Sequence, residues 1–437
     1  MSILPMKRRD WLRWCGQALA VAPFGSLLGC GQKQIATPSP KGPPYQGTDE
    51  QLLDEIQRSS FQFFWNETNP QTGQVKDRAL LNGNDTRKMA SIAATGFGLT
   101  ALCIGDSRGY GKTADISGRV RSTLQFLYQM PNVHGFFYHF VDMNTGQRWS
   151  NCELSSIDTS LLLCGVLTAR QYFQDAEIQD LATKVYERVE WPWMLNDGPT
   201  FSMGWHPESG FLNARWEHYC ELMMIYLLGI GSPTHPVSES TWNAWTRPTI
   251  TYQGLTYISG HDPIFTHQYS QAWFDFRHKK DAYANYFENS VTATKAHKLF
   301  CLSLAGRFSD YAEDLWGISA SDYVKGYTAW GGPPPQGPID GSIVPCATGG
   351  SLPFLYPDCI QVLRNIRGTY AAKAWGRYSY VDAFNPLSDW YDTDVLGIDL
   401  GITMVMAENY RSGLVWNTFM KNSEAQTAMT KVGFQQA

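Results

Sequence analysis

The sequence lacks the short motifs from which catalytic metal sites are usually built. Neither a Cys-x-x-Cys nor a His-Glu-x-x-His pattern occurs, and the nine histidines are scattered along the chain. Catalytic zinc draws its ligands from such closely spaced side chains. We therefore expect no catalytic zinc, no other metal and no cofactor.

Positive charge is also scarce. The 437 residues include 35 Lys and Arg against 40 Asp and Glu, which gives a formal net charge of -5. Four of the basic residues, Lys7, Arg8, Arg9 and Arg13, lie at the N-terminus, so the remainder of the chain is more acidic still. A nucleic acid or another polyanion would require a basic surface. We therefore expect no nucleic-acid partner.

The nine cysteines do not have the spacing of a disulfide framework. Cys15 and Cys30 belong to the N-terminal segment. Four others lie inside apolar helical runs, where cysteine behaves as a small buried hydrophobe: Cys103, Cys164, Cys220 and Cys301. One bridge, between Cys346 and Cys359, stays possible.

The first 30 residues have the pattern of an export signal. A basic start and a short apolar stretch over 14–29 are typical of a signal peptide, and the stretch is too short and too polar to span a membrane. Residues 7–12 resemble a twin-arginine signal, and residues 27–30 resemble a lipobox, in which the cysteine is lipidated. We expect an exported protein that meets the membrane only through a lipid on Cys30, facing the periplasm or the cell surface. An ordinary cleaved signal with a chance cysteine is the alternative.

The composition changes again between residues 31 and 47. This segment contains four prolines and no periodicity, and it is typical of a flexible linker. From residue 48 to residue 437 nothing has the composition of a second linker. We expect one large folded domain over 48–437, and a monomer.

Helical periodicity dominates the rest of the chain, whereas strand-like alternation is rare. The candidate helices are 49–67, 88–104, 116–129, 153–173, 178–189, 216–228, 281–305, 358–374 and 401–421, the last as one helix or as two halves. Helices of this length joined by long loops predict an all-α ring of paired helices, with the loops forming a cleft at one end. From periodicity alone an irregular helical array fits equally well.

Aromatic residues are abundant, with 16 Trp, 22 Tyr and 22 Phe. Flat rings stack on the C–H faces of sugars, so this composition suits a carbohydrate cleft, although most of the rings fill the core of a large domain. The Gly- and Pro-rich loop at 330–338, which begins with Trp330, is long enough to suggest a function. The segment 285–289 is also aromatic and is a candidate for sugar contact.

Glycosidic cleavage requires two carboxyl groups, one to protonate the leaving oxygen and one to activate water or attack the sugar. The acid must stay protonated near neutral pH, so an apolar setting that raises its pKa is favourable. Glu221 lies in the apolar run 216–228, and Glu217 is four residues earlier, on the same face of a helix. The alternative for Glu221 is a buried structural glutamate that Tyr or Trp donors satisfy.

Two further groups of carboxylates lie near the starts of apolar helical runs. Glu153 and Asp158 begin one run, with His139 and Asp142 in the loop upstream, and Asp399 begins another. Helix capping and the helix dipole explain Glu153 and Asp399 about as well as catalysis does.

In chain order, these residues and their neighbours resemble the bacterial glucoamylase-like domain family, whose characterised relatives include the β-1,2-glucanases of glycoside hydrolase family 144. The matching stretches are 153–165, 219–236, 267–277, 285–297, 331–353, 380–386 and 397–420. The resemblance implies that residues 48–437 form an (α/α)6 barrel. It also implies an inverting, metal-free glycoside hydrolase, without implying that the substrate is starch.

By this resemblance Glu221 matches the proton donor of the family. Four residues match its other acidic cleft positions: Asp142, Glu153, Asp158 and Asp399. Leu400 and Ile402 stand where the family tends to have Gln or Pro, so we favour the first three of these acids over Asp399 as the base. The residues expected to contact the sugar are His139, Trp216, Glu217, His235, Asn285, Tyr286, Glu288 and Trp330.

Three classes of function therefore remain in competition. The first is hydrolysis of a neutral β-glucan, with β-1,2-glucan as the leading substrate. The second is a polysaccharide lyase, which would want a basic cleft for uronic acids. The third is a non-catalytic glycan-binding lipoprotein, which would keep the aromatic rings but would not need Glu221 in an apolar run.

Overall fold

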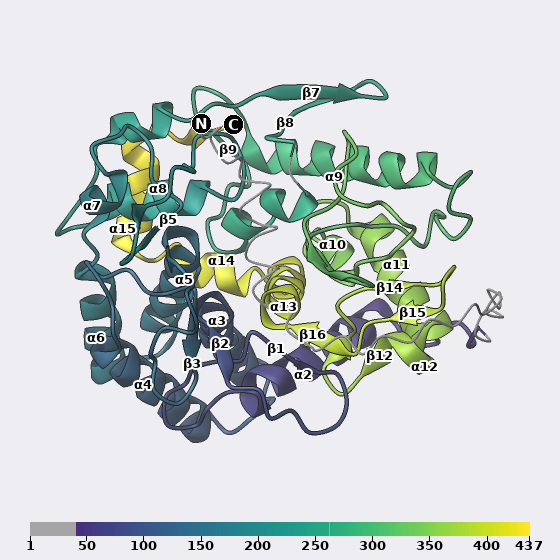
Figure 1. The fold of residues 1–437 in the computed structure, drawn as a ribbon, viewed down its shortest axis with the longest axis horizontal. Helices are drawn as coiled ribbons and strands as arrows, with labels where there is room; N and C mark the ends of the chain where they lie inside the picture. Colours follow the sequence, from purple (N-terminus) through teal and green to yellow (C-terminus); the bar gives the residue numbers. More distant parts are fainter. Residues whose placement is uncertain (1–40, 262) are drawn as a thin grey trace.

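The computed structural model describes residues 41–261 and 263–437, so the signal segment and Cys30 lie outside the described part of the chain. The helices form an (α/α)6 barrel, in which inner helices surround the axis and outer helices pack against them (Figure 1). The all-helical ring expected from the periodicity is confirmed, and the irregular array is not what the chain forms.

Four inner helices are buried on almost every side: α3 (Ile92–Ser107), α5 (Ser156–Tyr172), α8 (Met223–Gly231) and α13 (Gly397–Arg411). Helix α13 lies near the centre of Figure 1 and packs against α3, which packs against α5. A Cβ atom on Gly165 of α5 would lie 2.0 Å from the carbonyl oxygen of Gly96 on α3. The two inner helices therefore touch backbone to backbone.

The outer helices bury only one face, as surface helices do. They include α2 (Asp49–Asn66), α4 (Thr113–Gln129), α6 (Ala176–Glu187), α11 (Tyr356–Thr369) and α15 (Ser423–Lys431). The other helices are α7 (Trp191–Leu195), α9 (Tyr286–Ser303), α10 (Pro345–Gly349), α12 (Ala371–Ala374) and α14 (Leu414–Phe419). Helix α2 begins with a capping box between Thr48 and Gln51, which fixes its start.

The strands are short and pair locally or across the ends of the helices. Distant pairs are β1 (Arg78–Leu80) with β16 (Asp394–Leu396), β2 (Met89–Ser91) with β3 (Phe140–Asp142), and β9 (Lys279–Lys280) with β17 (Gln435–Gln436). One sheet has three strands, β4 (Leu154–Ser155), β5 (Gly204–His206) and β6 (Gly210–Phe211). The hairpins are β7/β8 (Thr249–Tyr252, Leu255–Ile258), β10/β11 (Ser321–Tyr323, Gly326–Thr328), β12/β13 (Trp375–Gly376, Ser379–Tyr380) and β14/β15 (Phe384–Asn385, Trp390–Tyr391).

Three of these strands lead directly into inner helices, and this arrangement positions the site. Strands β2, β4 and β16 end at Ser91, Ser155 and Leu396, which are the N-cap residues of α3, α5 and α13. Backbone hydrogen bonds tie the three starts together: Gly397 N–H to Asp77 O (2.8 Å), Asp77 N–H to Met89 O (3.0 Å), Ile92 N–H to His139 O (3.3 Å) and His139 N–H to Glu153 O (3.0 Å). The helices therefore begin at one shared end of the barrel.

The helix predicted over 216–228 is wrong in its first half, because α8 begins only at Met223. The preceding backbone pairs with other loops instead, with Trp216 N–H bonded to Phe201 O and Tyr219 N–H bonded to Thr246 O. Glu217 and Glu221 therefore do not share a helical face. The helix predicted over 401–421 is two helices, α13 and α14, which are separated at Gly413, where φ is +68°.

The possible Cys346–Cys359 bridge does not form. Among the described residues all seven cysteines are free thiols, and both of these are buried. Burial raises the pKa of each thiol well above its usual value, so both stay protonated and unreactive.

The end of the segment predicted as a linker lies against the domain. Gly42 N–H donates to Thr369 O, and the guanidinium of Arg364 donates to Gly47 O at 2.6 Å. Tyr45 donates its hydroxyl hydrogen to Glu55 on α2. None of the helices in the described part of the chain combines the length and the apolar character that crossing a membrane requires.

Candidate active site

Buried carboxylates gather where α5 and α13 begin. Asp158 and Asp399 both occupy the third helical position, where the helix dipole favours a negative charge. Burial raises the pKa of each, and the charge of Asp77, which precedes β1, contributes to both shifts. Asp77 thus connects the two helix starts into one electrostatic site.

On the α5 side a histidine lies between two carboxylates. His139 Nδ1 is 2.8 Å from Glu153 Oε1, and its Nε2 is 3.6 Å from Asp158 Oδ1. Glu153 is only 1% exposed; burial acts to raise its pKa, but the charge and hydrogen bond of His139 outweigh this, so the pKa lies below its usual value. Ser155, the N-cap residue, donates its hydroxyl to Asp158. The structure thus brings together three residues that the sequence proposed.

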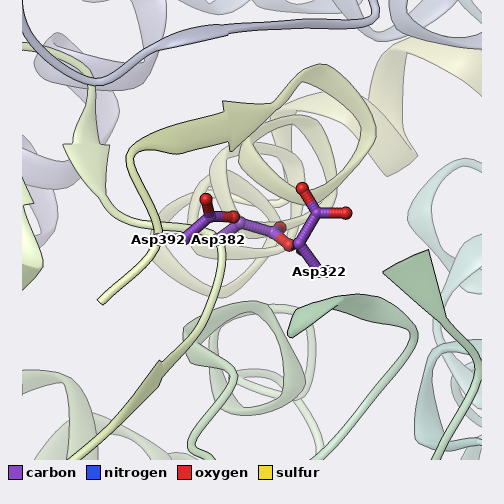
Figure 2. Close-up of side chains that lie close together, drawn as sticks. All are labelled: Asp322, Asp382 and Asp392. Atoms are coloured by element: carbon purple, nitrogen blue, oxygen red, sulfur yellow. Dashed lines mark hydrogen bonds between the residues drawn. The ribbon is translucent and has the colours of Figure 1, made fainter. Parts of the chain in front are cut away.

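On the α13 side the partners of Asp399 are mainly other acids. Burial raises the pKa of Asp399 to about 6, although hydrogen bonds from the side chains of Asp382 and Cys346 oppose that rise. Burial, then the charge and hydrogen-bond contact of Asp399, raise the pKa of Asp382 well above its usual value. Figure 2 shows Asp382 between Asp392 and Asp322. Burial and the charge of Asp322 raise the pKa of Asp392 to about 7.

Two arginines form ion pairs with the aspartates near the start of α13 and so offset part of their negative charge. Arg78 donates to Asp77 at 2.9 Å and to Asp322 at 2.6 Å. Arg87 donates to both carboxylate oxygens of Asp394, at 2.5 and 2.8 Å. A cleft of about 540 Å³ opens here, lined by Arg78, Thr86, Arg87, Lys88, Met89, Trp149 and Asp394. A half-buried tryptophan beside charged donors and acceptors suits a sugar, which offers both C–H faces and hydroxyls.

Glu221 lies two residues before α8 and is 5% exposed. Its carbonyl oxygen accepts the hydroxyl hydrogen of Ser270 at 2.5 Å, and Ser270 Oγ accepts the N–H of Met224 at 3.0 Å. Ser270 belongs to the 3-10 turn η3 (Tyr269–Ala272). Burial raises the pKa of Tyr269, and the charges of Asp399 and Glu221 raise it further. Tyr269 therefore lies within electrostatic reach of both carboxylates.

Several residues proposed as sugar contacts are part of the core. Trp216, Tyr286 and Trp330 are fully buried. Their polar atoms bond to protein: Trp216 Nε1–H to Ser156 Oγ (2.8 Å), Tyr286 O–H to Asp281 (2.9 Å) and Trp330 Nε1–H to Ser321 Oγ (3.0 Å). Their rings support the barrel and are not presented to solvent.

The other proposed residues have local structural contacts. Asn285 caps α9 by accepting the N–H of Glu288, and Glu288, Glu217 and His235 are exposed. Asp142 Oδ1 accepts the N–H groups of Asn144 (2.9 Å) and Thr145 (3.0 Å), which closes the turn after β3. Such a turn accounts for an aspartate at this position.

Sequence reasoning missed Arg78, Asp322 and Asp382. Asp382 lies in the stretch 380–386, and Asp322 and Arg78 lie in short strands, so no helical run marked them. Of the three, only Asp382 has apolar neighbours on both sides, Val381 and Ala383.

Asp322, Asp382 and Asp392 each offer an oxygen within 4.8 Å of the others, a spacing compatible with a cation. Two contacts argue against that use. The Arg78 guanidinium is already 2.6 Å from Asp322 and would repel a divalent ion, and Asp382 Oδ2 already accepts the backbone N–H of Asp322 at 2.7 Å. We therefore assign none of the three as a metal ligand.

Known proteins resemble the chain in both sequence and fold. Residues 213–423 match the model of a family described as "Putative glucoamylase". A curated relative, the exo β-1,2-glucooligosaccharide sophorohydrolase (non-reducing end) of Parabacteroides distasonis, is 29% identical over 89% of this chain, which spans 58% of the length of that relative.

Among solved structures, the endo-β-1,2-glucanase of Chitinophaga pinensis in complex with sophorotriose and glucose aligns with a TM-score of 0.84 and 28% identity. The match covers 89% of this chain and 99% of that one. A β-1,2-glucanase from Parabacteroides distasonis aligns with a TM-score of 0.83 and 28% identity, over 89% of this chain and 60% of that one. The chain is thus similar in sequence to part of this glucoamylase family model, and in sequence and fold to these β-1,2-glucanases.

Proposed function

We propose that the protein hydrolyses β-1,2-glucan, with Glu221 as the general acid and Asp399 as the base. The observation that carries this proposal is that Glu221 and Asp399 are both buried and that the charges of both raise the pKa of Tyr269. The activities of the relatives, which act on β-1,2-linked glucose, support the choice of substrate.

The choice of Asp399 replaces the sequence-based preference for Asp142, Glu153 or Asp158. Asp142 closes a turn, and Glu153 is paired with His139. Asp158 is held by Ser155 and faces His139. Asp399, with a pKa raised to about 6, is largely ionised at neutral pH yet basic enough to accept a proton.

In the proposed mechanism Glu221 gives its proton to the leaving glycosidic oxygen while Asp399 takes a proton from the attacking water. Water attacks the face of the sugar opposite to the leaving group, so the anomeric configuration inverts. Trp149, Arg78 and Arg87 line the cleft in which the glucan binds.

The test of substrate class is incubation with linear β-1,2-glucan, laminarin, starch and pectin. We expect new reducing ends from β-1,2-glucan alone. Ultraviolet-absorbing unsaturated ends from pectin would indicate a lyase, and binding without new ends would indicate a glycan-binding protein. Product sizes over time separate the exo action of one relative from the endo action of the other.

The test of the acid is Glu221→Gln, which keeps the shape of the side chain but removes its proton. General acid catalysis is worth about 10²–10⁴-fold, so kcat should fall by that factor while KM changes little. The anomer released first, read by NMR, should be inverted. Turnover near that of the wild type would remove Glu221 from the mechanism.

We further propose a monomer that is exported through the twin-arginine route and held by a lipid on Cys30. The support is the sequence of residues 1–30, which lie outside the described structure. Cys30→Ser should release the protein from the membrane fraction with unchanged activity. A variant that remains membrane-bound would contradict the lipid anchor, and size-exclusion chromatography of the released form tests the monomer.

A further inference from the structure

Two aspartates of the site have buried oxygens that no ordinary donor satisfies. Asp382 is 4% exposed and Asp399 is 6% exposed, and neither Asp382 Oδ1 nor Asp399 Oδ2 accepts a hydrogen bond from a backbone or side-chain N–H or O–H of the described residues. An ionised carboxylate can only accept, so a buried oxygen without a donor is unfavourable. This pair therefore requires an explanation.

The two side chains lie within hydrogen-bonding reach of each other. They also line the same small cavity, with about 10 Å³ of room for water, together with Cys346 and Thr403. Two ionised carboxylates in such contact would repel each other. One shared proton removes the repulsion and supplies the missing donor.

The surroundings decide which aspartate holds the proton. Asp399 has the N-terminal end of α13 and a hydrogen bond from Cys346, and both favour its charged form. Asp382 faces the acids Asp399, Asp322 and Asp392, which disfavour its charged form. The groups that face the pair from the packed elements are Asp77, Tyr269, Asp322, Tyr327, Cys346 and Asp392.

We propose that Asp382 is a protonated positioning residue whose carboxyl O–H donates to Asp399 and holds it ionised and oriented as the base. Its other oxygen, Oδ2, accepts the backbone N–H of Asp322 at 2.7 Å. One carboxyl thus bridges β10 and the start of α13, as donor on one side and acceptor on the other. The role of Asp382 in catalysis rests on the proposed function, whereas the shared proton does not.

Asparagine can reproduce both bonds. In Asp382→Asn the amide oxygen can accept the Asp322 N–H and the amide N–H can donate to Asp399. Alanine can do neither. The two variants therefore distinguish two states of Asp382. If Asp382 is a protonated donor, asparagine should preserve activity better than alanine. If Asp382 is ionised and binds a cation or a sugar hydroxyl, both variants should lose activity equally.

The experiment compares Asp382→Asn, Asp382→Ala and Asp399→Asn with the wild type on β-1,2-glucan across the pH range. We expect kcat of Asp382→Asn to lie within about tenfold of wild type and that of Asp382→Ala to fall about 10–100-fold, as loss of a supporting partner does. Any alkaline decline of the wild type caused by loss of the Asp382 proton should be absent in Asp382→Asn. Equal loss in both variants with unchanged melting temperatures would overturn the proposal.

A second measurement needs no substrate. Infrared difference spectra at neutral pH should show a protonated carboxyl C=O band in the wild type that Asp382→Asn lacks. Absence of the band, as for two ionised carboxylates bridged by water, would overturn the shared proton. So would a divalent cation that stabilises the wild type but not Asp382→Asn. If the wild type does not cleave β-1,2-glucan, the proposed function fails while the infrared band still tests the proton.

Discussion

Helices α5 and α13 begin in the same way but surround their first aspartate with opposite partners. Each follows a short buried strand, and each places an aspartate at its third position. Asp158 has a hydroxyl from its N-cap Ser155 and a histidine beside it. Asp399 follows an N-cap, Leu396, that offers no side-chain hydrogen bond, and its partner is another carboxyl.

The difference shows that helix position fixes where a carboxyl lies, but the neighbours fix its charge. On the α5 side a cationic partner lowers the pKa of Glu153 despite burial. On the α13 side no Lys, Arg or His of the described residues forms an ion pair with Asp399, and burial dominates the shift of its pKa. The carboxylates at the start of α5 are therefore suited to keeping a constant charge, and those at the start of α13 are suited to exchanging a proton.

The largest expected effect comes from replacing the two equivalent aspartates. Asp399→Asn should lower kcat about 10²–10⁴-fold, because it removes the proposed base. Asp158→Asn, its matched control at the same helix position, should lower kcat less, by about 10–100-fold at most, as loss of an outer partner does. Initial rates on β-1,2-glucan measure both. A larger loss for Asp158→Asn would reverse the assignment of the two clusters.

The next effect concerns the fixed charge of the α5 cluster. His139→Ala leaves Glu153 buried without its cation, and removing one partner of a buried pair costs about 3–5 kcal/mol of unfolding free energy. Denaturant unfolding measures this, and adding Glu153→Gln to His139→Ala should restore part of the loss. A loss below about 1 kcal/mol would mean that the pair is not the electrostatic anchor of this side.

A smaller effect tests how α5 is held against α3. Gly165→Ala would place a Cβ atom 2.0 Å from the carbonyl oxygen of Gly96, so the helices must separate. Such overpacking typically costs about 1–3 kcal/mol. The control is Gly118→Ala in α4, where nothing lies within 4 Å of the added atom, and which should stabilise the fold by about 0.4–1 kcal/mol. Equal effects on the melting temperature would contradict the backbone contact.

The smallest effect is the sign of the pH dependence. The folded pKa of Glu153 is lowered, so its stabilising contribution is present above its usual pKa and is lost as pH falls through the folded value. The folded pKa of Asp399 is raised from 3.8 to about 6, so stability falls as pH rises between these values.

Unfolding free energies measured from pH 2 to pH 8 should show this contrast. In Glu153→Gln the unfolding free energy should no longer show the fall toward acid pH that Glu153 causes. In Asp399→Asn it should no longer show the fall with rising pH above pH 4. Shifts of the same sign in both variants would mean that the two clusters do not differ in the proposed way.

Much of the site could be predicted from the sequence where its residues are close in the chain. Glu153, Asp158 and His139 lie within 20 residues, and the structure does bring them together. The start of α8 at Met223, two residues after Glu221, could not be predicted, because Trp216 and Tyr219 bond to Phe201 and Thr246, which lie outside this segment of the sequence. The burial of Trp330 and Tyr286 also depends on packing that composition does not reveal.

The sequence by itself determined the all-helical class and the positions of acids at the starts of apolar helices, because periodicity and capping are local properties of the chain. Only the tertiary structure decided which acids are charged. Asp322 pairs with Arg78, which is 244 residues away in the sequence. Asp382 lies in the loop between β13 and β14, whereas Asp399 lies in α13. Protonation depends on burial and on charges a few ångströms away in space, and neither is encoded by neighbours in the sequence.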